Sequence, residues 1–242
     1  MTGLPVRPAF ADAGEAADLA AFLARLIHYD RAAAVRLQAR ADGGTEQSLA
    51  VFGRPPSFEV LAVRSARLAA PVELDVTVSA GELLESIDEQ GATATVPAAV
   101  TGPPWAGLLP PRSGWRQLPG LPSPEALHSA VAAVVAEFRA RTEELPADRR
   151  TRAELDRIGR EIWTRPVGDT ALPVRAAHAA QSLGFLRPVR VTVPDLSDGT
   201  GAGHPGPYTL LGAGSWLRLR TPYGSTVVRA ASALGGLSVT PA

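Results

Sequence analysis

The stretch from residue 125 to residue 186 constrains the fold of this chain most, because it reads as three consecutive amphipathic helices. Helices this short cannot each maintain a buried apolar face alone, so they must pack on one another or on a sheet. The stretch closes on Gly184, and glycine commonly ends a helix in the left-handed conformation. The pattern predicts an architecture and carries no catalytic signature.

The ends of the three helices are predicted from capping residues. The first begins at Pro124 with Ser123 as its N-cap, because proline suits the first helical position and serine suits the cap. The second follows Pro146 with Asp148 as its cap, and the third follows Thr170. The apolar residues recur at steps of three and four. They are Leu127, Val131, Val134, Val135 and Phe138 in the first helix, and Leu155, Ile158 and Ile162 with Trp163 at the edge in the second.

The residues after the third helix predict strands. Residues 187–193 alternate between apolar and polar side chains, and residues 216–220 and 225–229 form a predicted hairpin around a turn at 221–224. The order helix, helix, helix, strand, hairpin resembles a winged helix, and the phrase from Ala177 to Arg187 resembles the end of its recognition helix. The resemblance covers about a quarter of the chain and implies a fold, not an activity.

The N-terminal half is predicted to be a small α+β unit. Asp12 and Glu15 have the spacing of a capping box before an apolar helix, and Ser79 and Glu82 repeat that spacing before a second helix. Four segments between these helices have strand character, and they cover residues 35–39, 49–52, 59–68 and 74–78. The predicted fold class is α+β, with an N-terminal antiparallel meander flanked by helices and a C-terminal half of three helices and a β-hairpin.

A proline-rich segment separates the two halves. Residues 97–124 contain too many prolines for a regular element, yet they carry Trp105 and Trp115. One interpretation is an exposed polyproline ligand around residues 110–112. The other is a strap anchored by its tryptophans, because a tryptophan left in water forgoes about 2–3 kcal/mol of burial. The predicted division is a domain at 1–96, the strap at 97–124, a second domain at 125–229 and a flexible tail at 230–242.

Composition excludes several kinds of site. The 24 basic residues are all arginine and balance 24 acidic residues, so no bulk charge favours nucleic acid or anionic lipid. Residues 1–96 hold 8 arginines against 13 acids, and residues 97–242 hold 16 against 11, which gives −5 and +5. This asymmetry favours docking of the halves or an affinity of the second half for phosphates. The lack of cysteine excludes disulfides and thiolate-bound metals, and no metal or cofactor is expected.

No catalytic constellation is visible in the sequence, and no signal peptide or long apolar run is seen, which predicts a cytoplasmic protein without membrane contact. The histidines His28, His128, His178 and His204 fall in four different predicted elements, so no pair has the spacing of metal ligands on one helix. The glycines of residues 201–206 match a dinucleotide-binding spacing, but no helix follows to bind phosphates.

Three classes of function are consistent with these observations. The favoured one is a non-catalytic protein that acts through contacts with an unidentified protein partner, with Trp105 and Trp115 at an interface. The second is a DNA-binding regulator, in which the third helix faces the bases. Its predicted contact residues are Arg149, Arg150, Arg152, Arg175, His178, Gln181, Arg218 and Arg220. The third is an enzyme or small-molecule binder with a pocket between the halves, which would have to gather His28, Tyr29 or arginines in one concave site.

Overall fold

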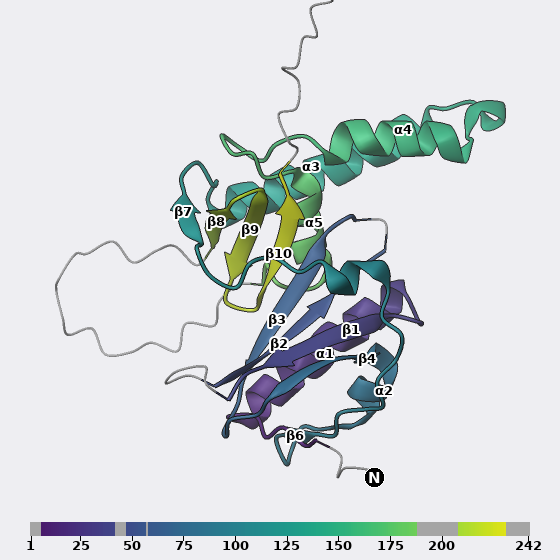
Figure 1. The fold of residues 1–242 in the computed structure, drawn as a ribbon. Helices are drawn as coiled ribbons and strands as arrows, with labels where there is room; N and C mark the ends of the chain where they lie inside the picture. The colour runs from purple at the N-terminus through teal and green to yellow at the C-terminus, as the bar shows by residue number, and fades with distance from the viewer. Residues whose placement is uncertain (1–5, 42–46, 57, 188–207, 231–242) are drawn as a thin grey trace, which may run out of the picture.

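A computed structural model describes residues 6–41, 47–56, 58–187 and 208–230. Its centre is one eight-stranded antiparallel sheet in the order β4-β1-β2-β3-β10-β9-β8-β7 (Figure 1). The strands are β1 Ala34–Ala39, β2 Ser48–Gly53, β3 Leu61–Arg67, β4 Leu74–Ser79, β7 Arg116–Leu118, β8 Thr209–Ala213, β9 Trp216–Thr221 and β10 Gly224–Arg229. The helices are α1 Ala13–Tyr29, α2 Ala80–Glu85, α3 Pro124–Glu143, α4 Arg152–Trp163 and α5 Val174–Ser182. Two short strands, β5 Ile87–Asp88 and β6 Thr93–Ala94, pair with each other.

The predicted α+β class and the elements of the N-terminal half are confirmed. The Asp12 side chain accepts a hydrogen bond from the Glu15 backbone N–H at 2.9 Å, and Ser79 accepts one from the Glu82 N–H at 3.4 Å. These are the two expected helix starts. The strand order differs from a simple meander, because β4 returns to pair with β1. The first strand therefore lies inside the sheet, with β2 on its other side.

The two halves join through the middle of the sheet. β10 pairs antiparallel with β3 through Ser225, Thr226 and Val227. On each side of this joint a helix precedes a three-strand meander, α1 before β1 to β3 and α5 before β8 to β10. The two units are therefore related by an approximate two-fold arrangement. Both helices pack on the same face, where the rings of Phe22 and Phe185 stack with centroids 5.6 Å apart.

Gly224 shows why the C-terminal hairpin fits so closely under this face. A Cβ atom added to Gly224 would lie 2.6 Å from ring carbons of Phe185. Real Cβ atoms do not approach other heavy atoms so closely. Gly224 and Phe185 are both buried in a closely packed core, so neither has space to move aside. A larger residue would therefore push the turn away from the helices.

The winged-helix expectation is not confirmed. The β9–β10 hairpin is not a free wing, because β10 pairs with β3 and β9 pairs with β8. The expected strand at 187–193 lies outside the described residues from 188 onward, as do the glycines of 201–206 and, from residue 231 onward, the predicted tail at 230–242. The sheet is continuous across the predicted domain boundary, and the division into domains stays a prediction.

Of the three predicted C-terminal helices, the first begins as expected, the third ends before Gly184 as expected but begins only at Val174, after Pro173, and the second has a different cap. The Ser123 hydroxyl caps α3 at the Ala126 N–H, and Gly184 follows α5 with a φ of +74°. The prediction that Asp148 caps the second helix is wrong. Residues Ala147–Arg149 form a separate 3-10 turn, and α4 is capped by Thr151, which accepts a hydrogen bond from the Glu154 N–H at 3.3 Å.

The proline-rich strap (residues 97–124) covers the sheet face opposite α1 and α5. It begins beside β4, where the Val100 N–H donates to the Thr77 carbonyl, and Arg36 donates to the Ala106 carbonyl at 2.7 Å. The teal strap then passes in front of β10 and β9 to reach β7 (Figure 1). Trp105 and Trp115 are half-buried and pack around a small apolar cluster of Phe52, Leu61, Val63 and Val227.

The α3–α4 hairpin projects away from the sheet (Figure 1). Near the sheet, Leu127 and Val131 are buried, while Val134, Val135 and Phe138 farther along α3 are only half-buried. Arg141 and Arg165 bridge the two helices through Glu161 and Glu137. No helix among the described residues is long and apolar enough to cross a membrane.

Candidate binding cleft

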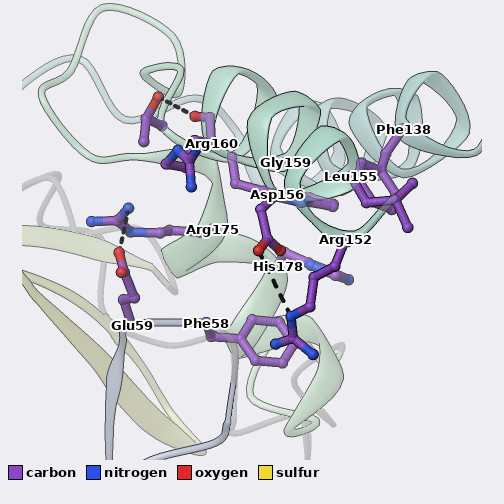
Figure 2. A pocket seen from close by; sticks show the side chains of 12 residues that line it. Phe58, Glu59, Phe138, Arg152, Leu155, Asp156, Gly159, Arg160, Arg175 and His178 are labelled. Atoms are coloured by element: carbon purple, nitrogen blue, oxygen red, sulfur yellow. Dashed lines mark hydrogen bonds and ion pairs between the residues drawn. The ribbon is translucent and has the colours of Figure 1, made fainter. Parts of the chain in front are cut away.

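A cleft of about 510 Å³ lies where the β2–β3 connection of the N-terminal half meets α4 and α5 of the C-terminal half (Figure 2). Its apolar and ring-bearing lining consists of Phe58, Phe138, Leu155, Gly159, Trp163 and His178. Its charged and hydroxyl lining consists of Glu59, Arg152, Asp156, Arg160, Thr164 and Arg175. The cleft therefore combines an aromatic floor with a charged mouth.

The aromatic floor is part of a continuous row of six rings. In order along the row they are Phe138, Trp163, His178, Phe58, Tyr29 and His28. Neighbouring centroids are 4.7–5.8 Å apart, and the closest pair is Trp163 and His178, whose planes are nearly parallel at 9°. The row crosses from α3 and α4 to the end of α1, so it bridges the two halves.

Local sequence explains how these rings meet. The α4 backbone at Gly159 lies close to two of these rings, since an added Cβ there would be in van der Waals contact with Trp163 at 3.4 Å and Phe138 at 3.7 Å. On the other side, Pro55 and Pro56 follow the end of β2 and cannot donate hydrogen bonds that would continue the strand. Glu59 then turns the chain back into β3 with a φ of +52°, a conformation uncommon outside glycine. Such backbone strain is concentrated at functional positions.

The charges at the mouth are only partly compensated. Arg175 forms an ion pair with Glu59 at 3.1 Å, which ties α5 to the β2–β3 connection. Arg152 lies 3.8 Å from Asp156, and its side chain is 92% exposed. The Arg160 side chain makes no ion pair with any described residue, and Figure 2 shows it beside the mouth. The mouth therefore has cationic groups available to an anionic ligand.

The His178 imidazole lies between two other rings at the floor of the cleft, where a ligand could contact it. Burial lowers the pKa of its imidazole, which favours the neutral form. Its ring lies between Trp163 and Phe58, and neither ring nitrogen is hydrogen-bonded to a described residue. Among the described residues, no cluster of three or more histidine, aspartate or glutamate side chains forms a metal site.

Comparison with known families places the two halves in two families without assigned functions. Residues 6–107 match a domain of unknown function, DUF8010, and residues 110–233 match a second, DUF8185. The second match spans slightly more than half of the chain. The chain belongs to the DUF8185 family. No curated protein and no solved structure matches it.

The cleft is lined from both matched regions. Phe58 and Glu59 come from the DUF8010 region, and the other lining residues come from the DUF8185 region. The site exists only when the two regions are docked. Two ion pairs support this docking, Arg175 to Glu59 and Arg187 to Asp18, and each joins a C-terminal cation to an N-terminal acid. In both pairs the cation comes from the half with net positive charge and the acid from the half with net negative charge.

The residues predicted to contact DNA are dispersed over four places. Arg152, Arg175 and His178 line the cleft. Arg149 and Arg150 lie at the tip of the α3–α4 hairpin, where Arg150 donates to the Leu145 and Glu143 carbonyls. Gln181 is exposed near the end of α5. Arg218 and Arg220 project from β9 toward the strap, on the sheet face opposite α5.

Sequence reasoning missed the partners that make the cleft. Phe58 was part of no predicted strand or helix face, and Trp163 was assigned only to the edge of an apolar stripe. Arg160 was one arginine on a face with mixed charges. A pattern of rings near predicted element ends, Tyr29, Phe58 and Trp163, was a usable signal, although only the fold shows that they adjoin.

Proposed function

We propose that this DUF8185 family member is a non-catalytic binding protein that holds a segment of a partner protein in the cleft between its halves. The row of six rings carries this proposal, because aromatic rings supply large contact areas at protein interfaces. Their polar neighbours fix orientation, and arginine is enriched with them at interface centres.

The shape of the cleft favours a chain segment over a compact small molecule. Small-molecule sites bury most of the ligand surface, whereas two residues at this mouth, Arg152 and Glu59, have side chains 92% and 68% exposed. The ring row also continues past the cleft to Tyr29, which is 41% exposed. An extended ligand can follow such a row, and a compact one cannot.

The arginines at the mouth of the cleft indicate which side chains the bound partner segment has. Arg160 lacks an ion-pair partner among the described residues, and Arg152 is only loosely held by Asp156. A carboxylate beside an aromatic or large aliphatic side chain would pair with these guanidinium groups while the apolar group contacts Trp163 and Phe58. The proposed partner segment is therefore apolar and acidic.

Selection from a random-peptide display library on the purified protein tests the proposal. We expect enriched peptides to combine aromatic or large aliphatic residues with aspartate or glutamate. Their binding is expected to fall by at least about tenfold in Trp163→Ala and in Arg160→Glu, because each change removes a contact worth about 1.4 kcal/mol or more.

Arg139→Glu is the matched control, since Arg139 is an exposed arginine on α3 that does not line the cleft. Peptides should bind this variant as they bind the wild-type protein. Failure to enrich any peptide, or equal binding to all four proteins, would contradict the proposal. Circular dichroism spectra of each variant would show that the fold is retained.

DNA binding is the alternative that needs a separate measurement. Binding to random-sequence duplex DNA should be measured at about 50 and 200 mM salt, because phosphate contacts give a steep salt dependence. Since the predicted contact residues lie in four places, we expect no saturable binding at either salt concentration. Binding that weakens steeply with salt and is lost in Arg149→Ala/Arg150→Ala/Arg152→Ala would favour the DNA-binding alternative.

A further inference from the structure

Arg218 on β9 is a half-buried cation to which no described residue supplies a counterion. It projects from the sheet toward the strap, where its guanidinium lies 5.8 Å from the centroid of the Trp115 ring. Its Nε atom is buried without a hydrogen-bond partner, and its side chain forms no ion pair with any described residue. Burial, followed by repulsion from Arg220, lowers the pKa of this guanidinium. An enclosed charge in this state is unfavourable unless something else neutralises it.

Arg64 shows how the same chain neutralises a buried arginine. The Arg64 side chain lies on the face of the sheet that α1 covers and is only 8% exposed. Its Nη2 atom lies 3.0 Å from a carboxylate oxygen of Glu15 and 3.3 Å from one of Asp18. Two carboxylates from α1 therefore surround that charge. No described carboxylate is placed in the same way beside Arg218.

A hollow of about 410 Å³ adjoins Arg218 between the strap and the sheet. Arg112 of the strap and the hydroxyl-bearing Ser48 and Ser65 also line it, and no described aspartate or glutamate does. A second hollow of about 330 Å³ shares Val63, Ser65 and Arg218 with the first and adds Arg220 and Ser225. Among the described residues, the space around Arg218 is therefore rich in donors and lacks acidic side chains.

The acid on this face is already occupied. Asp75 on β4 accepts hydrogen bonds from Arg36 at 2.9 Å and from Gln38 at 3.2 Å, and these contacts lower its pKa. Gln38 lies between this pair and the hollow, since it belongs to both. Asp75 therefore does not serve as the counterion of Arg218.

We propose that the hollow between the strap and the sheet binds a phosphate group through Arg218. Arginine is suited to this role because its planar guanidinium binds phosphate through two parallel hydrogen bonds. Serine hydroxyls and Arg112 supply further donors, while Phe52, Val63 and Pro111 offer an apolar surface to the remainder of an organic phosphate. The two hollows share no lining residue with the binding cleft, so the site does not depend on the function proposed for the cleft.

Thermal unfolding and isothermal calorimetry with two probes, inorganic phosphate and phenyl phosphate, test the site at constant ionic strength. We expect at least one probe to raise the Tm of the wild-type protein progressively with concentration, as a ligand of the folded state does. Arg218→Met should lower the affinity by at least about tenfold. Without probe, this variant should be as stable as the wild type or more so, because it removes an uncompensated charge.

Arg229→Met is the matched control, because Arg229 also stacks on a tryptophan, Trp216, at 5.1 Å but lies outside both hollows. It should retain the wild-type response. Ser65→Asp is a second variant, which places a carboxylate in the hollow and should remove the response to phosphate while the protein stays folded.

The two probes distinguish the source of the phosphate group. A response to inorganic phosphate identifies the free ion as sufficient, and a response to phenyl phosphate alone identifies an organic phosphate. The proposal is overturned if neither probe binds the wild-type protein, or if Arg218→Met and Ser65→Asp respond as strongly as Arg229→Met.

Discussion

At the scale of single residues, His178 in the cleft makes the free energy of unfolding depend on pH. Burial lowers its pKa below the ordinary value, so between the two pKa values the unfolded chain binds more protons than the folded one. The free energy of unfolding therefore rises with pH in this window. The contribution is complete above about pH 6.5, the ordinary histidine value, and declines as the pH falls below it.

We expect His178→Phe to flatten this part of the stability profile. Phenylalanine retains a ring between Trp163 and Phe58 but cannot be protonated. Urea unfolding at about pH 7.5 and pH 5.5 measures the effect. The loss of stability between the two pH values should be smaller in the variant than in the wild type. An equal loss in both proteins would show that His178 does not contribute.

Residue roles that depend on neighbours in sequence could be predicted, and those that depend on neighbours in space could not. The caps Asp12, Ser79 and Ser123 act on residues three positions away, so the sequence contains both partners. His178 was expected to face bases from an exposed helix. Its stacking on Trp163 depends on how α4 returns to α5, which no local pattern specifies.

At the scale of elements, the start of α4 gives a sharp test of capping. Thr151 accepts a hydrogen bond from the Glu154 N–H, whereas Asp148 lies in the preceding 3-10 turn. We expect Thr151→Ala to lower the free energy of unfolding by about 1 kcal/mol, the usual value of an N-cap. Asp148→Ala should change it by less than about 0.5 kcal/mol.

Both stabilities can be measured by urea unfolding monitored by far-ultraviolet circular dichroism. The two variants are matched, because each removes one short polar side chain from the same exposed connection. A larger effect of Asp148→Ala would restore Asp148 as the cap. Equal and small effects would mean that α4 is held by packing of Ile158 and Ile162 and not by its cap.

Elements with a regular period were predicted, and elements defined by pairing alone were not. β7 has only three residues inside a proline-rich segment, and it exists because Arg116 to Leu118 pair with β8. β8 carries the short apolar run Leu210–Leu211 next to glycine, which is too brief to show alternation. The position of β4 beside β1 likewise follows from packing, since the chain order suggested a meander.

At the scale of the whole molecule, the sequence suggested two units, and the structure joins them in one sheet and one core. The order of helices and hairpin resembled a winged helix because the sequence alone does not show whether the outer edge of the hairpin is paired. β3 occupies that edge. A single cluster of buried residues then extends from Phe10 and Leu19 in the N-terminal half to Leu127, Val174 and Val228 in the C-terminal half.

A shared core of this kind predicts cooperative unfolding. The four tryptophans, Trp105, Trp115, Trp163 and Trp216, all lie in the strap or the C-terminal half. Tryptophan fluorescence therefore reports unfolding of that part, whereas far-ultraviolet circular dichroism reports both halves. If the halves unfold together, the two signals should have the same urea midpoint and the same slope.

An N-terminal substitution that leaves every tryptophan in place, Arg64→Met, should then shift the fluorescence midpoint as much as the dichroism midpoint. The shift corresponds to about 2–4 kcal/mol, because removing Arg64 leaves the mostly buried Glu15 without its Arg64 partner. A fluorescence midpoint that does not move would mean that the halves unfold separately, as the division at residues 97–124 predicts. In that case the joint between β3 and β10, which has only the pairs from Leu61 to Val63, would be a docking surface between two domains.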